Sequence, residues 1–485
     1  MMCGGALLVA AAFLVNACGS GAAAGNHGGV APVDLLIIPA DASYPPQVQH
    51  FTGSELESGN VDLILSPGST VTAHVVSVSR VPINGADVRI RLRGTTLDTV
   101  VQTGPTGIFS LKLGAGVYDI TVTPDRTIWP TLPPHVFEAV TVPSTGGDVT
   151  LTLMMDPVVK IRGTVRDANG VLEGWRVSAR EESGVQGSTY TTTTLAGFEI
   201  YVTGSGSWLV TATPPTASTD FPVGTKRIAV AGTSTNFDFL YPSLTPHDVT
   251  GVVTGVGATT ADFGGVVVRA KAQLSSSDPD VTLAFDRQTT TDATGAFALP
   301  VVPGTYTFYI EPSIDSAWSH AVIPTQEVTD VSASPIPQAL TTLKPKAAIA
   351  GTVLGAGGGA ATSAKIRFSA ADGTLYQFSK RTDGAGTFGL GVNVGNYAVE
   401  IVPEPDSGLV RATSNTTVDH DATGVDFQLP EGARTVGRVL AEDGVTALAG
   451  ATVVAIDPDS EAAVGSAESL TDPNGHWVLS LPVLP

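Results

Sequence analysis

An internal repeat of about 90 residues constrains this sequence more than any other feature. A glycine followed within two residues by an aromatic side chain recurs every 89 to 99 residues, at Phe109, Phe198, Phe297, Phe388 and Trp477. Two further anchors keep the same register, an aromatic that opens a later strand and a proline six residues on: Tyr118 and Pro124, Trp208 and Pro214, Tyr306 and Pro312, Tyr397 and Pro403. A period of this length indicates a tandem array of small domains.

Each copy is predicted to be all-β. In the third copy, residues 266–272 alternate between apolar and polar positions, which is the signature of a half-buried strand. Thr291-Asp292-Ala293-Thr294-Gly295 is predicted to form a tight turn, because aspartate bonds back to the backbone and glycine accepts a positive φ. No convincing amphipathic helix follows Cys18. Short strands separated by turns at this spacing are typical of a sandwich or barrel.

The third copy carries the fullest motif: Gly251-Val252-Val253, then T-D-x-x-G-x-F over residues 291–297, then Pro303-Gly304-Thr305-Tyr306 and Pro312. This motif resembles the carboxypeptidase regulatory-like domain, a transthyretin-like β-sandwich similar in fold to starch-binding sandwiches. The resemblance implies an all-β tandem array of about five transthyretin-like β-sandwich domains of roughly 90 residues, the last incomplete. It specifies a fold well and a ligand poorly, because such domains are appended to many proteins.

Domain boundaries follow from the repeat. We expect a signal peptide with lipobox over residues 1–18, a flexible N-terminal segment over 19–60, and β-sandwiches over 61–156, 157–246, 247–345, 346–431 and 432–485. The first copy lacks the opening glycine. The fifth copy begins with Gly437-Arg438-Val439 but reaches Pro485 before a P-G-x-Y strand. We therefore expect an open sheet edge in the fifth copy and further chain beyond Pro485.

The N-terminus is predicted to direct export. Cys3 and Cys18 are the two cysteines of the sequence, so the later domains have neither a disulfide nor a thiolate metal site. The apolar run over residues 6–15 is too short to span a bilayer. It leads to Ala17-Cys18-Gly19-Ser20, which resembles a bacterial lipobox. The resemblance implies a lipid-modified Cys18 and an outer-membrane or cell-surface location; simple secretion is the alternative.

The charge balance limits the partners. Asp plus Glu number 45 against 25 for Lys plus Arg, a net charge of −20. Such a surface repels nucleic-acid phosphates and anionic lipid. We expect no nucleic-acid partner; the expected partners are the membrane, through the N-terminal lipid, and a polysaccharide or surface protein.

Catalysis and a cofactor are not predicted. His135-Val136-Phe137-Glu138 matches the His-x-x-Glu of zinc carboxypeptidases, but the α/β catalytic domain is absent, so we expect a partly exposed strand histidine. Three aspartate pairs could supply oxygen ligands to calcium: Asp278 with Asp280, Asp419 with Asp421, and Asp457 with Asp459. Solvated turn carboxylates are the default expectation for these pairs.

Three aromatic residues are candidates for carbohydrate binding. Trp129 and Trp318 follow the closing proline by five and six residues, and Phe221 lies near the same place in the second copy. Exposed rings there would stack on sugars. The alternative is that each ring covers the end of a sandwich core, since aromatics bury large areas.

Basic residues alternate with apolar ones along the second strand of four copies. They are Arg89, Arg91 and Arg93; Arg176 and Arg180; Arg269 and Lys271; and Lys365 and Arg367. We expect all of them to face solvent. Outward charges discourage sheet-to-sheet pairing; alternatively, Arg89, Arg91, Arg93, Arg269, Lys271, Lys365 and Arg367 form an intermittent track for an anionic glycan.

The sequence therefore predicts a non-catalytic cell-surface lipoprotein whose sandwiches serve as structural, adhesive or carbohydrate-binding modules. The alternative is an accessory segment of a larger secreted enzyme, such as a carboxypeptidase or glycoside hydrolase.

Overall fold

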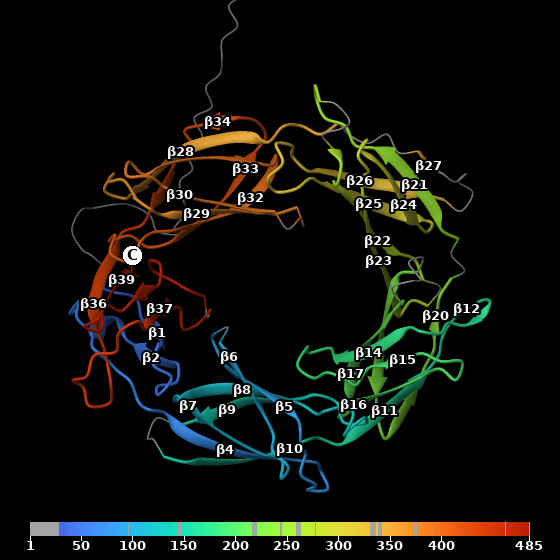
Figure 1. The fold of residues 1–485 in the computed structure, drawn as a ribbon, viewed down its shortest axis with the longest axis horizontal. Coiled ribbons are helices and arrows are strands. Elements are labelled where there is room, and N and C mark those ends of the chain that lie inside the picture. The colour runs from blue at the N-terminus through green and yellow to red at the C-terminus, as the bar shows by residue number, and fades with distance from the viewer. Residues whose placement is uncertain are drawn as a thin grey trace, which may run out of the picture.

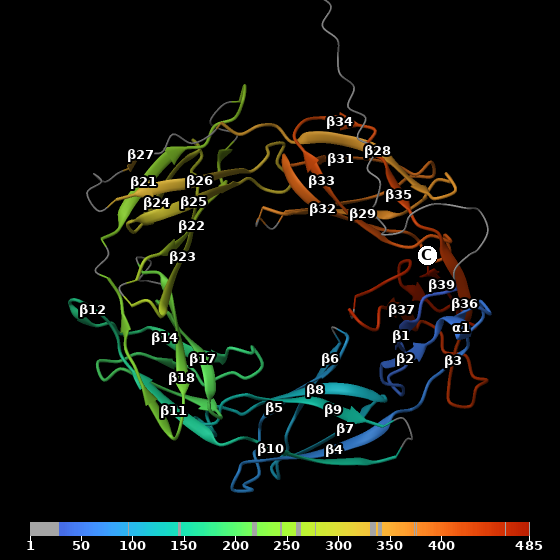
Figure 2. The ribbon, with the colours of Figure 1, turned by 180° about the vertical axis from the view of Figure 1, so that it is seen from behind.

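Five β-sandwiches follow one another around a closed ring, with the fifth beside the first (Figures 1 and 2). The computed structural model describes residues 29–484, apart from 96, 144–146, 216–220, 243–244, 259–262, 277, 330–335, 338–341, 373, 375 and 461. In each sandwich, a sheet built on the second strand of the copy lies on the inner side of the ring, and the layer built on the opening strand lies on the outer side (Figure 1). The predicted all-β sandwich array is confirmed.

The first sandwich packs sheet β6-β5-β8-β9 on sheet β10-β4-β7. Its strands are β4 (Ser69–Val76), β5 (Asp87–Leu92), β6 (Asp98–Gln102), β7 (Ile108–Leu113), β8 (Gly116–Thr123), β9 (His135–Val142) and β10 (Val149–Met154). The second comprises β11 (Val158–Gly163), β12 (Val165–Asp167), β13 (Gly170–Val171), β14 (Arg176–Glu181), β15 (Thr191–Thr192), β16 (Phe198–Thr203), β17 (Gly206–Thr213), β18 (Val223–Val230), β19 (Ser234–Asn236) and β20 (Phe239–Leu240).

The third and fourth sandwiches repeat this plan. The third contains β21 (His247–Val252), β22 (Val267–Leu274), β23 (Val281–Thr290), β24 (Ala296–Val301), β25 (Gly304–Glu311), β26 (Ala321–Val328) and β27 (Ile336–Pro337). The fourth contains β28 (Ala347–Gly355), β29 (Lys365–Ala370), β30 (Gln377–Arg381), β31 (Thr387–Val392), β32 (Gly395–Val402), β33 (Ala412–Val418), β34 (Ala422–Thr423) and β35 (Phe427–Leu429).

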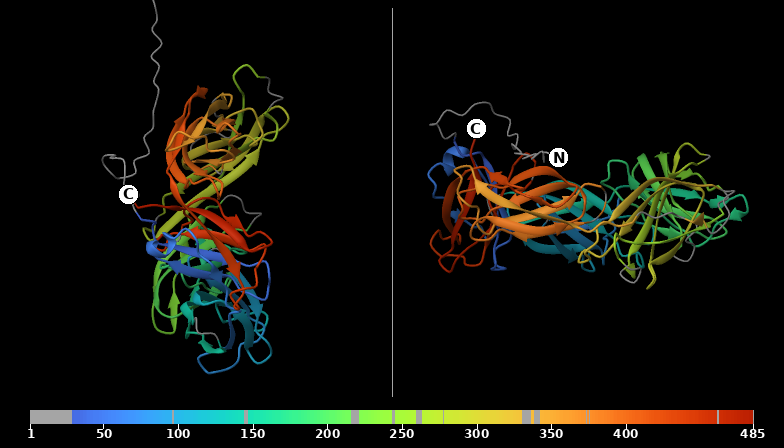
Figure 3. Two further views of the ribbon diagram at one scale, coloured as in Figure 1. Left: turned by 90° about the vertical axis from the view of Figure 1, so that its left-hand side faces the viewer. Right: turned by 90° about the horizontal axis from the view of Figure 1, so that it is seen from above.

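The fifth sandwich is built from both ends of the described chain. The C-terminal part supplies β36 (Gly432–Leu440), β37 (Thr452–Ile456), β38 (Ser469–Leu470) and β39 (His476–Pro482). The N-terminal part supplies β1 (Val33–Ile38), β2 (Gln47–Phe51), α1 (Gly53–Leu56) and β3 (Leu63–Ile64). In both views of Figure 3 the blue N-terminal strands lie with the red C-terminal strands.

The N-terminal strands take the positions that the fifth copy lacks. β1 pairs antiparallel with β37 from Asp34 opposite Ile456 to Ile38 opposite Thr452, as β8 pairs with β5. β2 pairs with β1 as β9 pairs with β8, and β3 runs parallel to β36 as β10 does to β4. We call the contacts between residues 30–65 and 432–484 the closing seam.

The closing seam corrects two sequence expectations. The edge expected to stay open in the fifth sandwich is occupied by β1 and β3. The prediction of a flexible segment over 19–60 is wrong for residues 30–60, because β1, β2 and α1 lie there, with Val33, Leu35 and Ile37 fully buried. Residues 19–28 and the predicted lipobox cysteine, Cys18, lie outside the described residues.

The repeat anchors are buried in every copy, as predicted. Phe109, Phe198, Phe297, Phe388 and Trp477 are each at most 6% exposed. The turn before each of them also follows the prediction: Gly386, for example, has a φ of +75°, and a Cβ there would lie 2.7 Å from the Val353 carbonyl oxygen. Only a residue without a side chain fits this position at low cost.

A buried threonine fixes the same turn to the second strand in all five sandwiches. In the fourth, Thr382 Oγ1 donates to the carbonyl of Ala361 at 2.6 Å and accepts the backbone N–H of Ala364 at 2.9 Å. The equivalent residues with the same pair of bonds are Thr103, Thr193, Thr291 and Thr471. This clasp satisfies main-chain groups that would otherwise be buried without partners.

Several junctions between sandwiches are continuous structure. Strands β18 and β23 pair, so one eight-stranded sheet spans the second and third sandwiches. Leu283 of the third sandwich is part of the core of the second. Leu36 and Ile456 of the fifth are part of the core of the first. The ring is therefore not a string of independent beads.

Candidate functional site

The three candidate carbohydrate-stacking aromatics are half-buried against sandwich cores. Trp129 packs on the first core and donates its Nε1–H to the carbonyl of Asn84 at 3.1 Å. Phe221 meets Trp175 edge to face, with ring centroids 5.5 Å apart. The ring of Trp318 packs against that of Phe263, with ring centroids 5.3 Å apart. This packing is the arrangement expected of rings that cover core ends, and sugar stacking on them stays a prediction.

The basic residues of the second strands face away from the cores, as predicted, and so lie on the inner side of the ring. Along β5, exposed Arg89 and Arg91 alternate with buried Val88, Ile90 and Leu92. Strands β22 and β29 show the same alternation, with the basic positions Arg269, Lys271, Lys365 and Arg367 turned from the core.

Carboxylates neutralise much of this basic face. Arg93 pairs with Asp119 at 2.7 Å and with Glu138 at 3.3 Å. The other pairs are Arg89 with Asp98 at 3.4 Å, Arg269 with Asp286 at 2.5 Å and Arg367 with Glu400 at 3.1 Å. Four of the seven predicted glycan contacts are thus in ion pairs. The face carries alternating charge, and anionic glycan binding there stays a prediction.

The His-x-x-Glu motif does not come together as a metal site. His135 begins β9 and is 5% exposed, whereas Glu138 is exposed on the opposite face and pairs with Arg93. The expectation of a partly exposed histidine is wrong: the ring packs edge-on against Phe137 at 4.4 Å, and burial lowers its pKa. Among the residues that the structure describes, no three His, Cys, Asp or Glu gather as a metal ion would require.

Two of the aspartate pairs have clear structural roles. Asp278 Oδ1 accepts the backbone N–H of Asp280 at 3.0 Å, and its other oxygen pairs with Lys226 at 2.5 Å. Asp457 accepts the backbone N–H of Asp459 at 3.0 Å. These carboxylates stabilise turns, as the default expectation had it.

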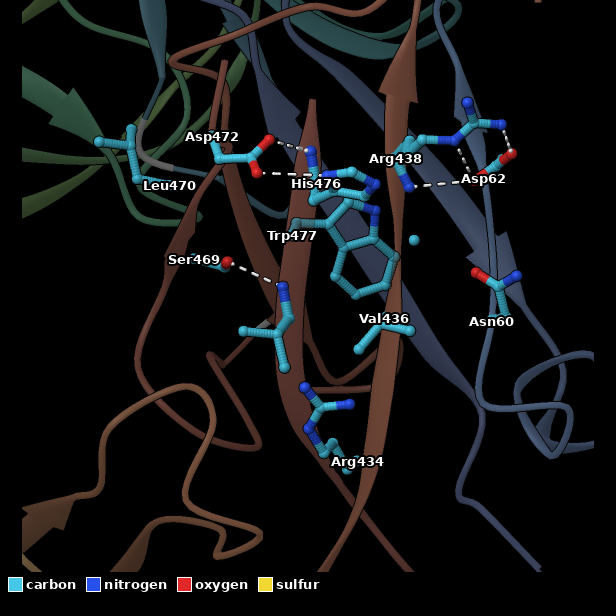
Figure 4. Close-up of a pocket in the computed structure, with 12 residues that line it drawn as sticks. Asn60, Asp62, Arg434, Val436, Arg438, Ser469, Leu470, Asp472, His476 and Trp477 are labelled. Carbon is cyan, nitrogen blue, oxygen red and sulfur yellow. Dashed lines mark hydrogen bonds and ion pairs between the residues drawn. The ribbon is translucent and has the colours of Figure 1, made fainter. Parts of the chain in front are cut away.

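A hollow of about 630 Å³ lies on the outer side of the fifth sandwich, across the closing seam (Figure 4). Asn60 and Asp62 line it from the N-terminal segment, and Arg438, His476 and Trp477 from β36 and β39. Leu470, 68% exposed, forms an apolar wall. Each end of the described chain supplies part of the lining, so this hollow of the fifth sandwich forms where the two ends meet.

The charges around this hollow are balanced. Asp62 accepts the backbone N–H of Arg438 at 3.0 Å and pairs with its guanidinium at 2.7 Å, which holds the pKa of the Asp62 carboxyl below its usual range. Asp472 Oδ2 lies 3.2 Å from Nδ1 of His476. The backbone N–H of His476 contributes most to lowering the pKa of Asp472. The paired groups suit a neutral polar ligand better than a free ion.

The second sandwich has a hollow of about 640 Å³ at the equivalent place. Asn236-Phe237-Asp238 occupies the position of Asn60-Val61-Asp62, and Thr164 donates to Asp238 as Arg438 donates to Asp62. The repeated Asn-x-Asp is a signal that sequence reasoning missed. It could have been found only by comparing the first 65 residues with later copies.

The comparisons with known proteins leave the site unassigned. No protein-family model matches the sequence, and no curated protein matches it. Among solved structures, the chain is similar to a streptococcal ancillary pilin at 13% identity and a TM-score of 0.24, over 57% of this chain and 99% of the pilin.

Two further structures show the same level of similarity. The Bacillus anthracis TIE protein matches at 11% identity and a TM-score of 0.18, over 83% of this chain and 69% of that one. BcpA, the major pilin subunit of Bacillus cereus, matches at 9% identity and a TM-score of 0.16, over 57% of this chain and 100% of BcpA. Such TM-scores assign neither a function nor a partner. In the described part of the chain, no helix is long and apolar enough to cross a membrane.

Proposed function

We propose that this protein is an exported, non-catalytic cell-surface protein that acts as a rigid structural or adhesive ring. Its five sandwiches are proposed to be of the carboxypeptidase regulatory-like type, on the motif described above. Cys18 is proposed as the lipid-modified residue that tethers the ring. Two acyl chains bury enough methylenes, at ~0.8 kcal/mol each, for stable anchoring.

The observation that carries the proposal is the continuity of the ring. The second and third sandwiches share a sheet, Leu36 and Ile456 of the fifth sandwich pack into the core of the first, and the closing seam joins the two ends. A flexible stalk would need independent domains joined by loose linkers. A ring fixed at these three junctions instead presents several surfaces at fixed positions, which favours multivalent attachment.

We further propose that the ring binds carbohydrate, and this proposal rests on the hollow of Figure 4. Paired arginine and aspartate groups offer adjacent donors and acceptors to hydroxyls, and Leu470 offers an apolar face to a sugar ring. The near-equivalent hollow in the second sandwich would give the ring two such sites.

Anchoring and ligand binding are tested separately. Mass spectrometry of the mature N-terminal peptide should find a diacylated Cys18, and Cys18→Ser should move the protein from the membrane to the soluble fraction. An unmodified Cys18 would refute the anchor.

For the ligand, a glycan array should show binding that falls when Leu470→Ala and His476→Ala are combined. The matched control is Val445→Ala, which removes a side chain that is 77% exposed on the same sandwich and does not line the hollow. Equal binding by the double variant and the control would exclude the hollow as the glycan site.

A further inference from the structure

The N-terminal segment, residues 30–65, enters the fifth sandwich as a separable unit. It contributes eight buried apolar side chains to that core: Val30, Val33, Leu35, Ile37, Leu56, Val61, Leu63 and Leu65. Nine come from the C-terminal part: Val439, Ala441, Leu448, Ala451, Val453, Ala455, Trp477, Leu479 and Leu481. Neither half can bury its apolar surface without the other, so each is an adhesive surface when alone.

The two halves are far apart in sequence. Asp62 and Arg438, which pair across the closing seam, are separated by 376 positions. Main-chain hydrogen bonds from Val61 to Val436 and from Leu65 to Leu440, both 2.8 Å, would form equally well with any C-terminal half of this sequence. The contacts alone therefore do not select the half that belongs to the same molecule.

The connection between the segment and the first sandwich is short. β3 ends at Ile64 and β4 begins at Ser69. Pro67 and Gly68 lie between them. Gly68 has a φ of +76°, and a Cβ atom there would lie only 2.5 Å from the carbonyl oxygen of Leu113. Short hinges favour exchange of the element they carry between copies, because they limit how that element can fold back.

We propose that the partner of this chain is a second copy of itself, bound by exchange of residues 30–65. The segment of one copy completes the fifth sandwich of the other, and residues 65–68 are the hinge that reorients between the closed and the exchanged form. All contacts of the closing seam are retained in the exchanged form. The closed ring is favoured in dilute solution by the high effective concentration of its own segment, and assemblies are favoured as protein concentration rises.

Exchange also changes the composition of the hollow in Figure 4. Asn60 and Asp62 would come from one copy and Trp477 from another. This inference goes beyond the proposed function, and its test does not require a ligand.

Two complementary variants of the full chain test the exchange. The first variant combines Leu35→Asp with Ile37→Asp and disables the segment. The second combines Leu479→Asp with Leu481→Asp and disables the C-terminal half. All four residues are at most 1% exposed. Neither variant can complete its own fifth sandwich, but the segment of the second can complete the C-terminal half of the first.

Light scattering coupled to size exclusion should show each variant alone as a monomer and an equimolar mixture as a one-to-one heterodimer. The control is a chain with all four substitutions, which should not form a heterodimer with either variant. Absence of a heterodimer from the mixture would overturn the proposal.

A second measurement covers misfolding of the variants. Wild-type chains with light and heavy nitrogen, unfolded and refolded together at high concentration, should yield dimers containing both isotopes. Inserting Gly-Ser residues between Pro67 and Gly68 should lower the dimer fraction several-fold. Only monomer at every concentration would also overturn the proposal.

Discussion

Replacing Gly437 with alanine should open the closing seam. A Cβ atom on Gly437 would lie 1.7 Å from the carbonyl oxygen of Val61 and 2.5 Å from its carbonyl carbon. Carbon atoms pack favourably only at about 3.5–4.0 Å. The obstacle is main chain, so no side-chain rotation relieves it, and Val61 must move away from β36.

The cost follows from what that movement breaks. The hydrogen bonds from Val61 to Val436 and from Arg438 to Asp62 are worth about 1 kcal/mol each. Val61 and Leu63 would leave the core, at about 1.5–3 kcal/mol for each side chain fully exposed. With partial exposure, we expect the free energy of unfolding of the fifth sandwich to fall by about 3–5 kcal/mol.

Hydrogen exchange read by mass spectrometry locates the effect. The amides of Val61 and Leu65 should lose protection in Gly437→Ala, while amides of the fourth sandwich should keep it. The first sandwich supplies the matched control, because Ala73 lies opposite Phe109 as Gly437 lies opposite Trp477. There β10 runs unbroken beside β4, and alanine fits.

The control substitution, Ala73→Gly, should cost only about 0.5–1 kcal/mol, through added backbone freedom. A Gly437→Ala variant that is no less stable than Ala73→Gly, with the amides of Val61 and Leu65 still protected, would refute the predicted steric clash.

Three further predictions concern the repeated unit. Phe297→Ala should cost about 3–5 kcal/mol and, because the third sandwich shares a sheet with the second, should expose both to protease, whereas Phe388→Ala should spare the second. Thr382→Val should lower the urea midpoint by an amount equivalent to about 2–4 kcal/mol, since it leaves a buried N–H and a buried carbonyl unpaired; Thr382→Ser should cost less. Hydrogen bonds from Thr387 lower the pKa of Asp383 in the folded protein below its ordinary value of 3.8. The Asp383 carboxylate therefore stabilises the fold fully above pH 3.8, and this stabilisation is lost as pH falls through the lowered pKa of the folded state. Asp383→Asn should flatten the acid side of a plot of urea midpoint against pH.

The repeating core could be predicted from the sequence because each anchor has one local cause. A phenylalanine after a glycine turn is buried in each of the first four copies, and the T-D-x-x-G turn needs only residues within five positions of one another. The outward direction of the β5 arginines, away from the core, also followed from the alternation of polar and apolar residues with period two.

The closing seam was missed because its signals lie in the wrong place for a linear repeat. Pro39 closes β1 as Pro124 closes β8, and Pro45-Pro46 precedes β2 as Pro133-Pro134 precedes β9. The aromatic that marks this strand elsewhere is replaced by Val33 in β1. Recognising these residues as the missing end of the fifth copy requires reading the repeat as circular.

The pairing of charges could not be predicted either. Arg93 meets Asp119 and Glu138 across two neighbouring strands, at separations of 26 and 45 positions. Such pairs depend on strand register, which alternation alone does not give.

The absence of the opening glycine from the first copy has a structural reason too. Where the parallel partner strand is unbroken, no carbonyl crowds that position, and Ala73 is accommodated.

A designed disulfide between β1 and β37 tests the central claim, that the N-terminal strands complete the fifth sandwich, most directly. Leu35 and Ala455 are directly opposite in the antiparallel register. Facing residues have Cα atoms about 4.5–5.5 Å apart, within the range of a disulfide. In a chain with Cys3→Ser and Cys18→Ser, the pair Leu35→Cys and Ala455→Cys should oxidise fully in dilute solution to a monomer, with peptide mapping showing residues 35 and 455 joined within one molecule. Two free thiols that react with alkylating reagent in the folded protein would contradict the account.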